Sequence, residues 1–144
     1  MGQVTRVEVV EYTDVMCSWA WGSEPKLRLL RWRYEDRCDW RLVMGGLVSD
    51  RTKNPAWDPV GPVPKTIAFW AQVAAHTGAP YPGHLKWLSS CSDAPGIGLC
   101  AARLQDDNVA LAGLRRMREA IFVFGCPTRW PGCSTLCRGR RSWT

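Results

Sequence analysis

Residues 12–22 read Y-T-D-V-M-C-S-W-A-W-G, and a short segment in which apolar and charged residues alternate leads into them. That segment, residues 6–12 (R-V-E-V-V-E-Y), has the period of two that is typical of a β-strand. The alternation stops at Asp14. We therefore expect a strand that leads directly into a turn carrying one cysteine, Cys17.

Local signals next to this turn indicate a helix. Ser23 is a suitable N-cap, Glu24 suits the positive end of a helix, and Pro25 is tolerated in a first turn. On these signals the helix begins at Ser23. The apolar stripe expected on it consists of Leu27, Leu30 and Tyr34.

Residues 40–44 predict a second strand, which two glycines close. The connection between the strands is long enough for a crossover helix, so we expect a β-α-β unit with parallel strands. Residues 49–64 are rich in Pro, Asp and Asn and predict a loop. A helix is expected over residues 64–77, ended by Gly78.

Two further helices are predicted by apolar residues at helical spacing. Their stripes are Ile97, Cys100, Ala101 and Leu104 in the first helix, and Val109, Gly113, Met117, Ile121 and Phe124 in the second. The pattern is lost after Gly125. We thus divide the chain into residues 1–48, a helical part over residues 49–125, and an unpatterned basic tail over residues 126–144 that we expect to be disordered.

Residues 12–22, with M-G-G-L at residues 44–47, resemble the DsbA-like family, whose members carry C-x-W-C-W-G after an acidic residue and a short apolar step. The similar branch is the cytoplasmic one of FrnE-like oxidoreductases, 2-hydroxychromene-2-carboxylate isomerase, kappa-class glutathione transferase and the Clp protease adaptor. The resemblance covers roughly residues 5–125. It implies an α/β, thioredoxin-like fold, in which a helical insertion separates the β-α-β half from two strands and a helix.

Two features depart from the family. Ala20 stands where the second cysteine is usual. The second half of the fold, with its cis-proline, has no counterpart in the nineteen residues after Gly125. The resemblance therefore implies a member that is C-terminally truncated or frameshifted.

The same resemblance makes Cys17 the nucleophile and places it in the first turn of the helix. The thiolate is the reactive form of cysteine, and backbone N–H groups at a helix N-terminus stabilise an anion. A second thiol normally resolves the mixed disulfide, and Ala20 cannot do so. Cys38 is expected roughly 25–30 Å away, at 1.5 Å per helical residue, which is too far for a disulfide. One-thiol chemistry stays open, with no cofactor beyond a low-molecular-weight thiol as co-substrate.

The residues that flank Cys17 are candidates for binding a substrate. They are Asp14, Ser18, Trp19, Ala20 and Trp21. The two tryptophans either line a groove or pack in the core. Asp14 is either an ionisable neighbour of the thiol or a turn residue.

Net charge, apolar runs and cysteine spacing argue against several classes of protein. The net charge is +6, of which the last nineteen residues supply +4, so the evidence for nucleic-acid binding is weak. No apolar run approaches the ~20 residues of a membrane span. Seven cysteines without a secretory leader favour free thiols and the cytoplasm. The spacing of Cys126, Cys133 and Cys137 does not match a zinc site.

Three functional hypotheses follow. The first is thiol oxidoreductase or monothiol transferase chemistry at Cys17, with a small-molecule or protein thiol as partner. The second is a non-catalytic adaptor that binds a protein. The third is an inactive truncated product, for which we expect no cooperative melting transition.

Overall fold

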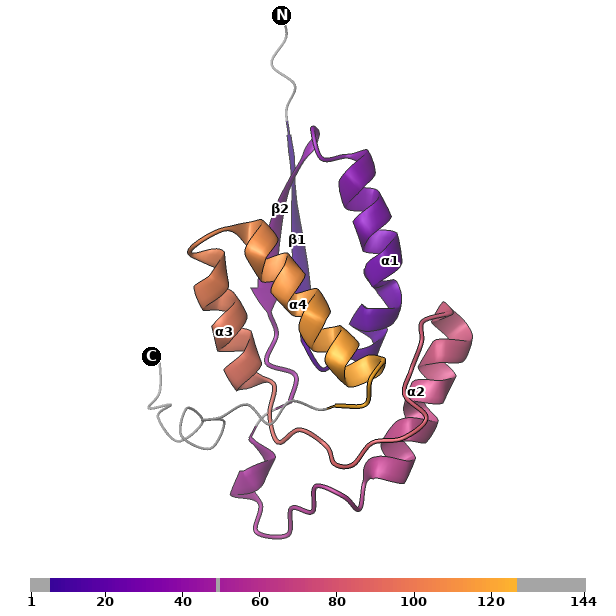
Figure 1. Ribbon diagram of the computed structural model, residues 1–144. Helices are drawn as coiled ribbons and strands as arrows, with labels where there is room; N and C mark the ends of the chain where they lie inside the picture. The colour runs from indigo at the N-terminus through magenta and orange to yellow at the C-terminus, as the bar shows by residue number, and fades with distance from the viewer. Residues whose placement is uncertain (1–5, 49, 127–144) are drawn as a thin grey trace, which may run out of the picture.

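The computed structural model describes residues 6–48 and 50–126 (Figure 1). Strand β1 (Val7–Thr13) leads into helix α1 (Ser18–Arg33), and strand β2 (Cys38–Met44) follows. The strands are parallel and pair over their whole length, with Val7 opposite Cys38 and Thr13 opposite Met44. The predicted β-α-β unit and its parallel pairing are confirmed.

The rest of the described chain is helical. A short 3-10 helix, η1 (Arg51–Lys53), interrupts the predicted loop, and partial burial lowers the pKa of Arg51 from its ordinary value. Helices α2 (Val63–Thr77), α3 (Asp93–Arg103) and α4 (Asp107–Phe122) follow. Gly78 ends α2 with a φ of 73°, a left-handed conformation that glycine adopts without strain.

The helices predicted over residues 97–124 exist, but of the predicted stripe residues only Ile121 is buried. On α4 the buried positions include Ala110, Leu114, Arg118 and Ile121. Val109 is 50% exposed. The first three buried positions thus each lie one residue later than the predicted Val109, Gly113 and Met117, because α4 buries the arginine Arg118, which an apolar pattern does not detect.

On α3 the shift is in the opposite direction, because Gly96 and Leu99 are buried in place of Ile97 and Cys100, together with Ala94 and Pro95. Leu104 is 89% exposed. Gly96 lies against the end of β2, where an added Cβ would be at ordinary contact distance, 3.7 Å, from Met44.

The main core lies where α1, α2, α4 and the loop before α3 meet below the sheet. The indole rings of Trp21 and Trp70 both contact Phe122, with centroids 6.1 and 4.7 Å from it. Leu85, Leu88, Leu99 and Ile121 complete this cluster.

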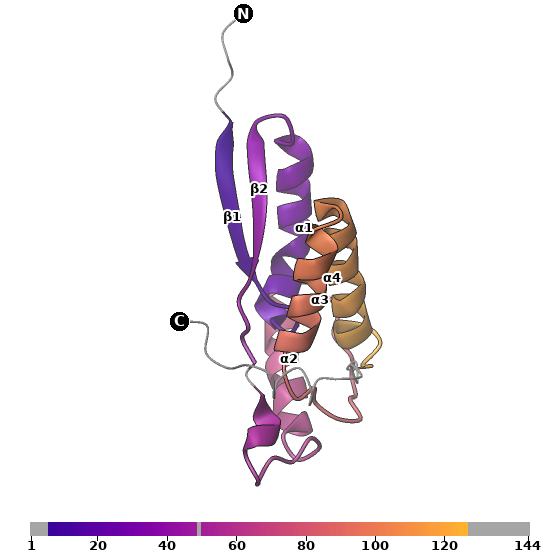
Figure 2. The ribbon, with the colours of Figure 1, turned by 90° about the vertical axis from the view of Figure 1, so that its left-hand side faces the viewer.

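In Figure 2 strand β1 lies at one side of the molecule with β2 next to it, and α4 reaches the carboxyl end of β1 through Arg118. The outer edge of β2 is partly covered, because Arg103 of α3 donates to the carbonyl of Leu42. Among the described residues, no strand pairs with the other edge of β1.

Candidate functional site

Cys17 is the N-cap of α1. Its Sγ accepts a hydrogen bond from the backbone N–H of Ala20 at 3.4 Å, and its carbonyl accepts one from Trp21 at 3.0 Å. The thiol is free and half-buried, while Ser18, the first helical residue, is buried. A negative charge on Sγ would therefore face the unsatisfied N–H groups and the positive dipole of the first helical turn.

The helix start that local signals predicted at Ser23 was wrong. The helix begins five residues earlier, so Pro25 lies inside it rather than in its first turn. Glu24, expected to interact with the helix dipole, is instead buried and forms ion pairs with α4. The resemblance, which put Cys17 at the helix start, gave the better placement.

The turn that carries Cys17 is held by the buried side chain of Asp14. One carboxylate oxygen accepts from the N–H of Met16 and the other from the N–H of Leu47, both at 2.8 Å. The hydroxyl of Ser92 also donates to the second oxygen at 2.8 Å. Asp14 thus connects the end of β1, the segment after β2 and the start of α3.

Arg118 of α4 supports the same turn from the other side. It is 2% exposed, donates to Thr13 Oγ1, and donates to the carbonyl of Asp14 at 3.1 Å. A further guanidinium nitrogen lies 3.3 Å from Glu24 Oε2. The carbonyl of Asp14 also accepts from the N–H of Cys17 at 3.3 Å. A chain of hydrogen bonds therefore joins α4 to the cysteine.

Sequence reasoning missed Arg118 and Ser92. A signal for Arg118 was available, because it lies four residues after Leu114 and three before Ile121, at the spacing of a buried helix face. Ser92 had no such signal: its partner, Asp14, is 78 residues away in sequence.

The two tryptophans that flank Cys17 have different surroundings. Trp21 is buried, stacks on Phe122 and donates from its indole N–H to the carbonyl of Pro80 at 2.9 Å. Trp19 is 48% exposed, and its ring lies 6.0 Å from that of His76 on α2. Trp21 is thus a core residue, whereas Trp19 is accessible near the site.

Cys38 is placed away from this turn. Cys38 lies opposite Val7, at the start of β1, whereas Cys17 follows its end. Six residues of strand at ~3.3 Å each put about 20 Å between those two ends. Ala20 and the separation of Cys38 together leave Cys17 without a resolving thiol in this part of the helix.

A cavity of about 370 Å³ lies between α1 and α4, and Cys17 is not among its lining residues. Its walls combine Leu27, Leu111 and Leu114 with the Arg31–Glu11 ion pair.

In the described part of the chain, no group of three His, Cys, Asp or Glu residues is placed to hold a metal ion. The helices described there are also too short or too polar to cross a membrane.

No protein-family model matches the chain. The ClpXP adapter protein SpxH of Shouchella clausii (strain KSM-K16) is 24% identical over 120 residues, which cover 81% of this chain and 38% of that protein. The chain therefore spans well under half the length of this curated relative.

Solved structures show the fold. The cytosolic disulfide reductase DsbM from Pseudomonas aeruginosa aligns with TM-scores of 0.66 alone and 0.65 with GSH, at 22% and 24% identity. These alignments cover 92% and 85% of this chain, but 66% and 60% of DsbM. A Nitrosomonas europaea structure aligns with a TM-score of 0.66 at 19% identity, over 83% of this chain and 56% of its own. The thioredoxin-like fold implied by the DsbA-like resemblance is confirmed.

Proposed function

We propose that the protein acts through Cys17 as a single-thiol nucleophile that forms and releases mixed disulfides. The observation that carries the proposal is the position of Cys17: a free, half-buried thiol at the N-cap of α1, with the Ala20 N–H on its sulfur. Helix N-termini stabilise thiolates, and the thiolate is the attacking form.

The chemistry needs two exchange steps. The Cys17 thiolate attacks one sulfur of a disulfide, so that a new S–S bond to Cys17 forms and the other sulfur leaves as a thiolate. A second, low-molecular-weight thiolate then attacks the mixed disulfide and releases Cys17. In sum the disulfide exchanges one of its sulfurs for that of the small thiol, with no net redox change at the protein.

In this proposal the second thiol comes from solution, because Ala20 occupies the position of the resolving cysteine and Cys38 lies at the other end of the strands. Glutathione is the natural class of co-substrate, and the DsbM structure that contains GSH supports this choice for the fold. A small or protein disulfide would be the other substrate. The cytoplasm is the compartment that suits this cycle, because it maintains a pool of reduced thiols.

The test compares Cys17 with Cys100, a free and more exposed thiol in the last turn of α3. That turn is the negative end of its helix, which disfavours a thiolate. We expect iodoacetamide at pH 6 to alkylate Cys17 at least about tenfold faster than Cys100. Cys17→Ser should abolish the fast phase and Cys100→Ser should keep it. Equal rates at the two cysteines would remove the enzymatic proposal.

A second candidate is a non-catalytic adaptor that binds a protein partner. The similarity to an adapter protein, SpxH, favours it. Here binding depends on the surface and not on the thiol, so a partner captured by the wild-type chain under reducing conditions should also be captured by Cys17→Ser. Loss of the partner in that variant would count against an adaptor whose binding does not depend on the thiol.

A further inference from the structure

The cavity between α1 and α4, about 370 Å³ in volume, is enclosed by elements that the structure describes. Both helices lie on one side of the two strands (Figure 2), so this space is separate from the open outer edge of β1. Its apolar walls are Leu27 of α1 and Leu111 and Leu114 of α4. Pockets for small molecules typically enclose roughly 300–1,000 Å³, with mostly apolar walls and a few polar groups. Size and lining therefore both suit a small ligand.

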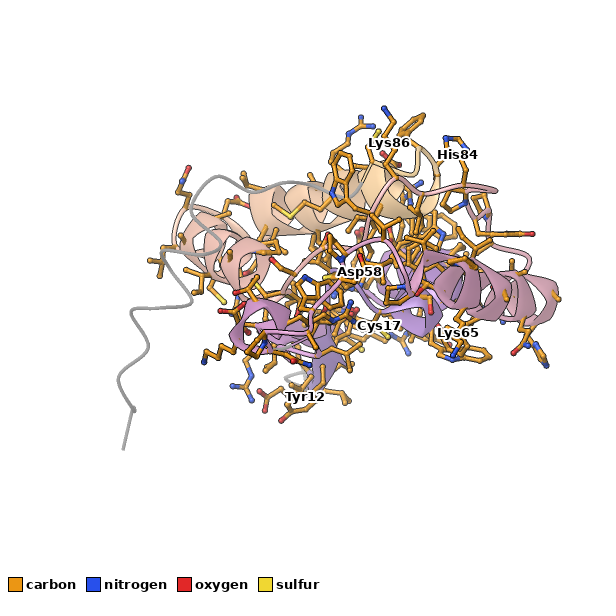
Figure 3. All side chains as sticks on the ribbon, turned by 90° about the horizontal axis from the view of Figure 1, so that it is seen from below. Tyr12, Cys17, Asp58, Lys65, His84 and Lys86 are labelled. Atoms are coloured by element: carbon orange, nitrogen blue, oxygen red, sulfur yellow. The ribbon has the colours of Figure 1, made fainter. Side chains whose placement is uncertain are left out.

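Strand β1 supplies a polar floor to this cavity through Glu11. Tyr12, the next residue, projects at the periphery of the molecule, away from the helices (Figure 3). Side chains alternate between the two faces of a strand, so Glu11 points toward the helices. There its Oε2 accepts from Arg31 Nη2 at 2.8 Å, and the two side chains are 13% and 17% exposed. The apolar cavity thus ends at an ion pair that is largely shielded from water.

Positive charge exceeds negative charge around the cavity. Two glutamates line it, and a third carboxylate, that of Glu119, pairs with Arg115 from outside the lining. The four arginines of the lining are Arg28, Arg31, Arg115 and Arg118. Of these, Arg28 is exposed at the rim and forms no ion pair with a described residue. Its guanidinium group can therefore receive an anion without breaking an existing pair.

Hydrogen-bond donors without acceptors occur at the same place. Among the described residues, two buried side-chain nitrogens lack a partner, Arg118 Nε and Trp40 Nε1, and both are donors. Arg118 lines the cavity, and Trp40 lines a second cavity of about 310 Å³ that shares Arg31 and Leu111 with the first. Buried donors are normally satisfied, and leaving one unpaired is unfavourable. The space between α1 and α4 is thus short of acceptors.

From these observations we propose that the cavity binds a small organic acid with an apolar body. The apolar body lies against the leucines, and the acid group lies at the rim beside Arg28. A guanidinium group matches the two oxygens of a carboxylate and pairs with it through two parallel hydrogen bonds. An acid also brings the acceptors that the lining lacks, whereas a cation with the same body would meet like charge.

This site is distinct from the one at Cys17. Glu24, the lining residue of α1 nearest to Cys17 in sequence, is seven residues further along, or about 10 Å at 1.5 Å per residue. Binding of the acid therefore does not depend on the proposed thiol chemistry. Cys17→Ser should bind the acid as the wild-type chain does, so failure of the thiol chemistry and failure of this site give different results.

Two probes with similar apolar chains and opposite charges test the proposal. We expect isothermal titration calorimetry of the full chain to give octanoate a Kd at least about tenfold lower than octylammonium, because only the carboxylate is complementary to the guanidinium groups. Arg28→Gln should raise the Kd for octanoate about three- to fivefold. Lys26→Gln is the matched control: it removes the same charge from an exposed residue of α1 outside the lining and should leave the Kd unchanged.

A bulky side chain placed in the cavity provides a second test. Ala112 is exposed and lines the cavity, so Ala112→Trp should abolish octanoate binding while circular dichroism stays unchanged. Val109→Trp is its control on α4, because Val109 is 50% exposed and lines neither cavity.

Three results would each overturn the inference. They are a wild-type chain that does not bind octanoate, equal affinities for octanoate and octylammonium, and equal losses in Arg28→Gln and Lys26→Gln. Loss of binding in Val109→Trp as complete as in Ala112→Trp would place the ligand elsewhere and overturn it as well. The charge variants decide the question even if Ala112→Trp does not fold.

Discussion

Strand β1 has two contrasting surroundings. At its carboxyl end, Thr13 and Asp14 are buried, and hydrogen bonds join them to three helices and to the segment after β2. Along its outer edge, Glu8 and Tyr12 are exposed, and their backbone groups face away from β2. The first region is held in one geometry by polar contacts that water cannot replace. The second region, the outer edge, tolerates substitution because water can hydrogen-bond to its exposed backbone groups.

The largest expected effect is at Arg118. Arg118→Met removes the buried donor that Thr13 Oγ1, Glu24 Oε2 and the carbonyl of Asp14 share, and we expect a loss of about 3 kcal/mol in the free energy of unfolding. Urea denaturation measures it. Arg116→Met is the matched control on the same helix, since the Arg116 side chain is 83% exposed, and should cost less than about 0.5 kcal/mol. Similar losses in both variants would show that the Cys17 end is not held by Arg118.

Asp14→Asn is expected to cause the second-largest loss in the free energy of unfolding. The amide keeps one acceptor but turns an NH₂ group toward the N–H of Leu47 or Met16, at a cost of about 2 kcal/mol. Asp50→Asn is its control, because a single oxygen of Asp50 accepts both of its bonds from Thr52, and an amide oxygen can do the same. If Asp14→Asn is as stable as Asp50→Asn in urea, the buried carboxylate is not required.

Gly22→Ala tests the packing of α1 beside Cys17. A Cβ there would lie 2.6–2.8 Å from side-chain atoms of Thr77, so we expect a loss of about 1–2 kcal/mol by thermal or urea unfolding. Gly83→Ala, with nothing within 4 Å, should change little. The loss should shrink when Gly22→Ala is made in a Thr77→Ala background. An undiminished loss there would contradict the steric explanation.

Cys17→Ser should have the smallest effect on stability and the largest on reactivity. Serine is a favourable N-cap and can accept the N–H of Ala20 in place of sulfur, so unfolding should change by less than about 0.5 kcal/mol. Tyr12→Lys, on the exposed edge, should change the stability of the chain equally little. A large loss in Cys17→Ser would mean that the thiol is a packing residue, and the proposed chemistry would lose its basis.

Much of the fold was predictable from sequence because its signals are local. The alternation of apolar and charged residues before Asp14 predicted β1, and Gly78 predicted the end of α2. Local signals failed at the start of α1. Ser23 and Pro25 favour a helix that begins at Ser23, but residues 18–22 are already helical. Tertiary contacts outweigh propensity there, since Trp21 packs on Phe122 and Gly22 fits against Thr77.

In the candidate site, too, some features were predictable from the local sequence and others only from tertiary contacts. The motif around Cys17 located the thiol, and Ala20 excluded a second cysteine three residues on. The role of Asp14 as the centre of a turn was one of two alternatives, and only its bonds to Leu47 and Ser92 distinguish them.

The sequence by itself therefore determined the order of strands and helices, the parallel β-α-β unit and the one cysteine of the motif at residues 12–22, because each depends on residues that are near one another in the chain. The tertiary structure decided which faces of α3 and α4 are buried, that Arg118 reaches the turn before Cys17, and which edge of β1 is open. The contacts of Ser92 and Arg118 with Asp14 join segments 78 and 104 residues apart. Their free energies depend on the distance and burial of both partners, and no local pattern carries either quantity.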